Sequence, residues 1–245
     1  MNLEKYQQYS RIARGLEKAD LVLKNARIVN VFTEEIIRGD IAIQDGIIAG
    51  IGSFHGKEER DLAGRYVCPG FIDSHLHLES TLVTPAELVT VASRHGTTTF
   101  IVDPHESANV SGLAGIDYIL DQTEDVKANV YVMMPSCVPA TAIDDNGCTL
   151  TAEDMVPYLH NSRILGLGEV MDSISVVQGE KSMHDKLELF EGRIRDGHAP
   201  FLEEGDLQAY AMAGIATDHE CSFFDYAMRE RRNGLTILVR EGSAA

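Results

Sequence analysis

The chain has 245 residues, 44% of them apolar, and a formal net charge of −17. This length fits one large globular domain or a large and a small one, and the charge argues against nucleic acids and anionic membranes as partners. No run approaches the ~20 apolar residues that span a bilayer, and the four scattered cysteines form neither a zinc nor a disulfide pattern, so we expect a reduced, cytoplasmic protein.

The N-terminal quarter of the chain predicts a helix followed by short strands. Residues 1–20 are polar with a helical pattern, and they lack the apolar centre of a secretory signal. Residues 21–53 alternate between apolar and polar positions, which is typical of half-buried strands. Asp45-Gly46 lies between two such runs and indicates a tight hairpin, because both residues tolerate positive φ. We interpret 21–66 as part of a small β-domain of the sandwich kind.

From residue 67 to 245 the pattern changes to strands alternating with helices. Thr84-Pro85 predicts a helix start, and Gly197 and Gly234 are interpreted as helix stops before the next strand. Such alternation indicates an α/β fold with a parallel sheet, either doubly wound or closed as a (β/α)8 barrel. The apolar runs taken as seven strands are 66–72, 97–102, 129–134, 163–167, 198–202, 214–217 and 235–239.

The positions of the polar residues favour the barrel. Barrel enzymes carry their chemistry at the C-terminal ends of several strands, whereas a doubly wound sheet concentrates it near one switch point, often with a Gly-rich phosphate loop. The sequence contains no such loop. The polar groups at predicted strand ends are His75 and His77, Asp103-Pro104-His105-Glu106, Pro135-Ser136-Cys137, Glu169, His198, and His219-Glu220.

The strongest local signal is Pro69-Gly70-Phe71-Ile72-Asp73-Ser74-His75-Leu76-His77, a buried strand that runs into two histidines. Residues two apart on a strand face the same side, so both imidazoles can be directed at one divalent cation. Glu169, His198 and His219 each follow a later predicted strand. Taken singly, each is as compatible with a structural role as with a ligand role, and only their order along the chain favours a metal site.

The sequence resembles the adenine deaminase family of the amidohydrolase superfamily. The first motif is shared across the superfamily, while the combination of DPHESANV, PSCVPAT and DHE is more restrictive. The resemblance covers nearly the whole chain from residue 21 onward. It rests on the motifs PGFIDSHLHLES, VTPAEL, HGTTT, DPHESANV, PSCVPAT, GLGEVMD, GHAP, AGIATDHE and REGSAA.

The resemblance implies hydrolysis of adenine to hypoxanthine and ammonia by a metal-activated hydroxide, a step of purine salvage. His75 and His77 would bind one metal, Glu169 would bridge two, and the second would be held by His198 and His219. The resemblance implies manganese or iron more than zinc as the metal. It implies a small purine base as the partner molecule, and it is compatible with a homo-oligomer. His105 and Glu106 would contact the purine or relay protons, with support of the metal ligands as the alternative. The implied catalytic set is therefore Glu169, His219, His105 and Glu106.

The sequence departs from the family pattern at two loops and at its end. Residues 171–176 replace an aromatic-Pro-Gly turn, and 201–205 replace a glycine-containing loop. An eighth barrel strand, with the aspartate that normally ends it, is not found. We therefore expect the chain to be an incomplete piece of a barrel enzyme, in preference to a natural short relative that closes its barrel through a partner chain. Two alternatives follow: an amidohydrolase of another cyclic amidine or amide, or a catalytically silent metal-binding chain.

Overall fold

The computed structural model describes residues 1–141 and 143–240. The chain divides into two compact units, Met1–Pro69 and Gly70–Ala245. Among the described helices, none has both the length and the apolar character needed to cross a membrane.

The first unit is one five-stranded sheet with a helix. The helix α1 (Leu3–Ala13) begins at Asn2, whose side chain accepts a hydrogen bond from the backbone N–H of Lys5. The strands run in the order β3-β2-β1-β4, and β5 also pairs with β1. Their bounds are β1 Ala19–Asn30, β2 Glu35–Gln44, β3 Ile47–Gly52, β4 Gly56–Asp61 and β5 Tyr66–Val67.

The hairpin predicted in this unit is confirmed. Strands β2 and β3 are antiparallel, with Gln44 opposite Ile47. Asp45 and Gly46 between them have φ values of 50° and 74°. Two consecutive positive φ angles match the right-handed twist of the flanking strands, which is why the Asp-Gly pair is suited to this turn.

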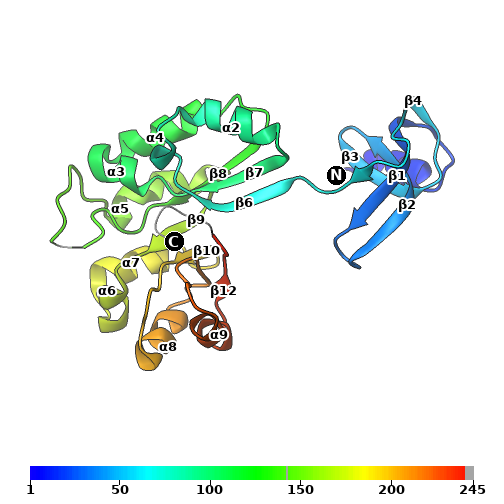
Figure 1. The fold of residues 1–245 in the computed structure, drawn as a ribbon. Helices are drawn as coiled ribbons and strands as arrows, with labels where there is room; N and C mark the ends of the chain where they lie inside the picture. The colour runs from blue at the N-terminus through cyan, green and yellow to red at the C-terminus, as the bar shows by residue number, and fades with distance from the viewer. Residues whose placement is uncertain (142, 241–245) are drawn as a thin grey trace. The chain divides into compact units, whose positions relative to one another are not determined.

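Within its described residues, the second unit carries seven parallel strands in chain order, and Figure 1 shows how the main sheet runs from β6 to β10. Five form one sheet from β6 to β10, and β11 and β12 form a further parallel pair. The backbone N–H of Ala216 donates to the carbonyl of Arg195 at 3.0 Å, so the pair continues from β10. The incomplete α/β barrel is therefore confirmed. The strands are β6 Phe71–Leu76, β7 Thr97–Val102, β8 Asn129–Met134, β9 Ile164–Val170, β10 Ile194–Gly197, β11 Thr217–Asp218 and β12 Thr236–Ile237.

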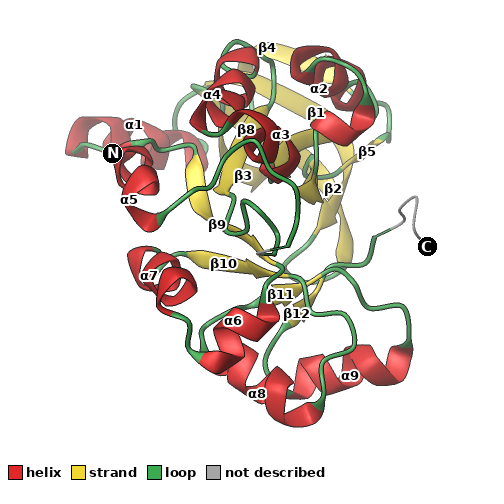
Figure 2. Ribbon diagram, turned by 90° about the vertical axis from the view of Figure 1, so that its left-hand side faces the viewer, coloured by secondary structure: helices red, strands yellow, loops and turns green. Residues whose placement is uncertain are grey.

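Helices surround these strands, and the core of the unit lies between the two (Figures 1 and 2). Phe100 of β7, Leu167 of β9 and Phe190 after α7 are among its fully buried members. The helices are η1 Glu79–Thr81, α2 Pro85–Ser93, α3 His105–Ser111, α4 Leu113–Gln122, α5 Ala152–Met155, η2 Val156–His160, α6 Ser173–Gln178, α7 Lys181–Leu189, α8 Glu204–Met212 and α9 Phe224–Arg232.

Two strand predictions were wrong in position. The predicted strand 198–202 is a loop, and the strand before it is β10, which ends at Gly197. Pro200 has no backbone N–H to donate to a neighbouring strand, and Phe201 has a positive φ of 58° that is incompatible with extended backbone. This segment therefore cannot continue the strand. Gly197 is thus no helix stop: a side chain there would overlap the Thr217 carbonyl of the neighbouring strand.

The predicted run 66–72 is likewise two strands that belong to different units. Tyr66-Val67 pair with β1 in the first unit, whereas β6 begins at Phe71. Pro69 between them lacks a backbone donor, and a side chain on Gly70 would overlap Thr98. The remaining strands agree with the predicted runs within a few residues, although β9 extends to Val170 and so includes Glu169.

We expect Phe100→Ala to destabilise the second unit by about 3–5 kcal/mol, because it empties a fully buried site in the core. Urea-induced unfolding would measure the change. The control is Phe224→Ala, in which the lost ring is 78% exposed and belongs to the same unit. An equal effect of the two substitutions would contradict the assigned core.

Candidate metal centre

Several strands of the second unit end at histidines that face one buried carboxylate. His75 belongs to β6, and His77 directly follows that strand. Glu169 lies in β9, His198 follows β10 and His219 follows β11. Since all these strands are parallel, their C-terminal ends meet at the same end of the barrel.

The two oxygens of the Glu169 carboxylate face different imidazoles. Oε1 lies 3.3 Å from Nε2 of His77 and 3.1 Å from Nδ1 of His105. Oε2 lies 2.9 Å from Nδ1 of His198 and 3.1 Å from Nε2 of His219. The carboxylate is buried, with only 3% of its side chain exposed. It therefore stands between two separate groups of nitrogen atoms.

The imidazoles of His75 and His77 present two lone pairs to each other. Nδ1 of His75 is 2.8 Å from a carboxylate oxygen of Asp196, and Nδ1 of His77 is 2.8 Å from the Asp103 carbonyl oxygen. Both partners are acceptors, so each Nδ1 carries the proton and each Nε2 is left unprotonated. The two Nε2 atoms are 3.1 Å apart. Such an arrangement is repulsive by itself and is relieved by a cation between the nitrogens.

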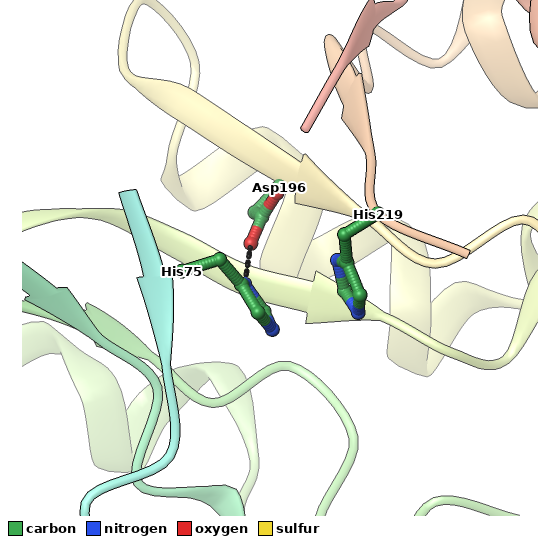
Figure 3. A group of neighbouring side chains, drawn as sticks. All are labelled: His75, Asp196 and His219. Carbon is green, nitrogen blue, oxygen red and sulfur yellow. Dashed lines mark hydrogen bonds and ion pairs between the residues drawn. The ribbon is translucent and has the colours of Figure 1, made fainter. Parts of the chain in front are cut away.

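Figure 3 shows His75 with two of its neighbours, Asp196 from β10 and His219 from the end of β11. The rings of His75 and His219 stack with centroids 3.7 Å apart. The His219 side chain is 1% exposed, its Nε2 faces the Glu169 carboxylate, and its Nδ1 has no hydrogen-bond partner among the described residues. Buried ring nitrogens are normally satisfied, so a nitrogen lone pair in this position fits a metal ligand.

The backbone around Glu169 is held from two sides. Its N–H donates to the Asp103 carboxylate at 2.7 Å, and its carbonyl accepts from the Ser136 hydroxyl at 2.6 Å. Lys186, which is buried, donates in turn to the Ser136 carbonyl at 2.7 Å. Gly168 is required here because a side chain would overlap the Asp103 carboxylate. These contacts fix the direction in which the Glu169 side chain points.

The charges of the site follow from burial and from these contacts. Burial by itself would raise the pKa of Glu169, but the neighbouring His198, His219 and His105 outweigh it and hold that pKa well below its ordinary value. The pKa of His198 is raised, because its contact with Glu169 outweighs the opposing effect of burial. Burial and the charge of Glu169 raise the pKa of Asp103 well above its ordinary value. Glu169 is therefore the anion of the cluster.

The structure separates the neighbouring residues His105 and Glu106. His105 faces Glu169, as described above. Glu106 is exposed on α3, and its carboxylate accepts hydrogen bonds from the Ser80 hydroxyl at 3.0 and 3.1 Å. Successive residues of a helix point about 100° apart, which explains why only one of the two joins the cluster.

Asp196 is the functional position that the sequence reasoning missed. Besides His75, its carboxylate accepts hydrogen bonds from the Gly197 N–H and the Thr217 hydroxyl. Its sequence neighbourhood, Asp196-Gly197-His198, carries no motif that predicts a partner at position 75. The only available signal was its location two residues before His198, at the end of the strand that His198 follows.

The donor set fits two divalent ions that share a carboxylate. One group of converging ligand atoms comes from His75, His77 and Glu169, and another from Glu169, His198 and His219; within each group the atoms lie within 4.8 Å of one another. Neutral imidazole and carboxylate are ligands of first-row transition metals. The Nδ1 contacts of His75 and His77 match the way in which metal-binding histidines are oriented in proteins.

Comparison with known proteins gives one consistent family. Residues 66–240 match the amidohydrolase family. An adenine deaminase of Desulfitobacterium hafniense is 58% identical over 245 residues, which are 100% of this chain and 43% of that protein. An adenine deaminase of Clostridium acetobutylicum is 49% identical over 235 residues, 95% of this chain and 41% of that protein. The chain thus spans about two fifths of the length of these relatives.

Solved structures show the same fold at low sequence identity. A 5-methylcytosine deaminase from Klebsiella pneumoniae, liganded with 5-fluorocytosine, has a TM-score of 0.55 and 16% identity, with 88% of this chain and 64% of that chain covered. An atrazine chlorohydrolase from Arthrobacter aurescens, complexed with zinc, has a TM-score of 0.52 and 13% identity. The match covers 89% of this chain and 70% of that chain.

We expect Gly168→Ala to weaken Mn²⁺ binding by about 10–100-fold, because the new methyl group displaces the Asp103 carboxylate that holds Glu169. Calorimetric titration of the metal-free chain would measure the affinity. The control is Gly205→Ala, where a side chain meets no atom within 4 Å. Equal Mn²⁺ affinity in the two variants would refute the role given to Asp103.

Proposed function

The chain belongs to the amidohydrolase family, and we propose that the protein hydrolyses adenine to hypoxanthine and ammonia. The observation that carries this proposal is the division of the Glu169 carboxylate between His77 on one oxygen and His198 and His219 on the other. A carboxylate placed in this way can bridge two ions. The names and the 42–58% identity of the curated relatives support adenine as the substrate.

We assign one metal to His75, His77 and Glu169, and the second to Glu169, His198 and His219. When bound, such ions supply the Lewis acidity that makes a hydroxide nucleophile available near neutral pH. Manganese or iron is preferred to zinc in this proposal because the resemblance to adenine deaminases implies it, and a set of imidazole and carboxylate ligands is compatible with these ions.

The protein's own groups orient the site and handle the protons. Asp196 and the Asp103 carbonyl hold the Nδ1 protons of the two β6 histidines, which keeps each Nε2 available as a ligand. In the reaction a C–O bond forms at the ring carbon that carries the exocyclic amine, the C–N bond to that amine breaks, and ammonia leaves after gaining a proton.

We assign the proton relay to His105. Its Nδ1 lies 3.1 Å from Glu169, its side chain is 19% exposed, and burial lowers its pKa, so it can accept a proton at neutral pH. Glu106 is proposed to contact the purine from the exposed side, which requires its carboxylate to leave Ser80. The assignment of His219 to the catalytic set rests on its place beside Glu169.

We place this activity in cytoplasmic purine salvage. All four cysteines are free thiols, which fits a reducing compartment. A homo-oligomer is compatible with the proposal, and no step of it requires one.

The proposal is tested in a chimera in which this chain replaces the matched 43% of the Desulfitobacterium hafniense adenine deaminase. We expect the Mn²⁺-loaded chimera to release ammonia from adenine. Glu169→Gln should lower kcat/KM by more than about 100-fold, since even residues that only support a metal ligand contribute 10–100-fold. The matched control is Glu191→Gln, which changes an exposed carboxylate in the same way.

Two results would count against the proposal, each against a different part. A folded, metal-loaded chimera without adenine turnover would remove adenine as the substrate. Full activity of Glu169→Gln would instead remove the bridging role while leaving the substrate in place.

A substrate panel addresses the altered loops 171–176 and 201–205. We expect the chimera to favour adenine over 5-methylcytosine and over a cyclic amide such as hydantoin by at least about 100-fold in kcat/KM, because a site that hydrogen-bonds one heterocycle leaves its polar groups unpaired with another. Comparable turnover of hydantoin would show that the chain serves a different cyclic substrate.

A further inference from the structure

A second cluster of buried acidic groups lies next to His219 but outside the Glu169 centre. Asp218 ends β11, Cys221 follows three residues later, and Glu230 projects from α9. Asp218 and Glu230 are both 0% exposed. One sulfur and two carboxylate oxygens of these residues lie within 4.8 Å of one another.

The hydrogen bonds of the cluster leave one oxygen without a partner. The two oxygens of Asp218 accept from the backbone N–H groups of Ala199, at 2.6 Å, and Glu220, at 2.8 Å. Oε2 of Glu230 accepts from the Cys221 thiol, at a sulfur-to-oxygen distance of 2.8 Å. Oε1 of Glu230 has no hydrogen-bond partner among the described residues. A fully buried carboxylate oxygen in this state is costly unless a cation or a proton satisfies it.

No basic side chain supplies that cation within the described part of the chain. The arginines nearest in sequence on α9 are engaged elsewhere: Arg229 pairs with Glu204, and Arg231 donates to the Leu235 carbonyl. The Tyr226 hydroxyl donates to the Ala199 carbonyl, and although it lies close enough to Glu230 to lower the pKa of that carboxyl, it carries no positive charge. Burial and the charge of Asp218 raise the pKa of Glu230 to about 7, so near neutral pH a metal ion competes with a single proton for this oxygen.

We propose that Asp218, Cys221 and Glu230 form a third metal site, selective for zinc-like ions and separate from the Glu169 centre. Thiolate is a soft ligand that favours Zn²⁺ over Mn²⁺, whereas the Glu169 centre offers only imidazole and carboxylate. Burial and the carboxylates of Glu230 and Asp218 raise the pKa of the Cys221 thiol, so the thiol is protonated in the metal-free protein. On binding, the ion displaces this proton: the Cys221 S–H bond breaks, the proton leaves to solvent, and the sulfur forms a bond to the metal with both electrons of the former S–H bond. An ion here would tie α9 to the segment that carries His219.

Cobalt provides the test, because Co²⁺ replaces zinc and bonds to thiolate with a near-ultraviolet charge-transfer band. We expect the purified 245-residue chain to show this band on loading with Co²⁺ and to lose it when Zn²⁺ is added in equal amount. Cys221→Ser should abolish the band. The matched control is Cys68→Ser, which removes an exposed thiol outside the cluster and should leave the band unchanged.

Two further variants keep the test decisive if Cys221→Ser fails to fold. Glu230→Gln preserves side-chain shape and the thiol, and should weaken the Co²⁺ affinity read from the band by more than about 10-fold. Glu169→Gln should leave the band intact while it removes adenine turnover in the chimera, so the two proposals fail independently.

The proposal is overturned if the Co²⁺-saturated chain shows no such band, or if the band survives in folded Cys221→Ser. Loss of the band in Glu169→Gln would show that the sulfur belongs to the Glu169 centre and would refute a separate site. Unchanged Co²⁺ affinity in Glu230→Gln would show that Glu230 is merely protonated.

Discussion

The buried charge of Glu169 is the constraint on which the polar end of the barrel depends. A carboxylate with 3% of its side chain exposed is costly unless it is paired and hydrogen-bonded. The pairing comes from histidines that four different strands deliver, and the backbone of Glu169 is fixed by Asp103 and Ser136. The arrangement therefore requires the strands to be in register, and a shift of one residue would direct Glu169 into the helices.

The glycines of the strands explain how so many polar groups fit at one place. Side chains at Gly166 and Gly197 would overlap carbonyls of the adjacent strands, and one at Gly168 would overlap the Asp103 carboxylate. The strand Ile164–Val170 alternates Gly166 and Gly168 with Leu167 and Glu169, so one strand contributes both to the core and to the site. The two glycines of this strand are thus required by packing.

How far the sequence predicts this structure depends on the range over which each signal acts. The Asp45-Gly46 hairpin and the His75/His77 pair are local signals of φ preference and of strand period, and both are found where they were expected. Strand β10 was misplaced because Ile194-Arg195-Asp196-Gly197 contains one large apolar residue. Its Asp196 is buried, and one of the groups that pair with its carboxylate is His75, 121 positions away in the chain. No pattern within the segment can predict such a contact, and the same holds for the bond between Asp103 and Glu169.

Buried carboxylates lie on both sides of strand β11, and they are paired with different kinds of group on the two sides. Successive side chains of a strand point to opposite sides, and Asp218 and His219 stand next to each other at its end. On the side of His219, the anion Glu169 is surrounded by imidazoles. On the side of Asp218, the partner groups are a thiol and backbone N–H groups, and Glu230 keeps one oxygen unpartnered within the described residues. In the proposed arrangement only the Asp218 side offers a thiolate, so a soft ion such as Zn²⁺ gains an additional favourable ligand there, whereas the imidazole and carboxylate ligands of the Glu169 side suit harder and softer divalent ions alike.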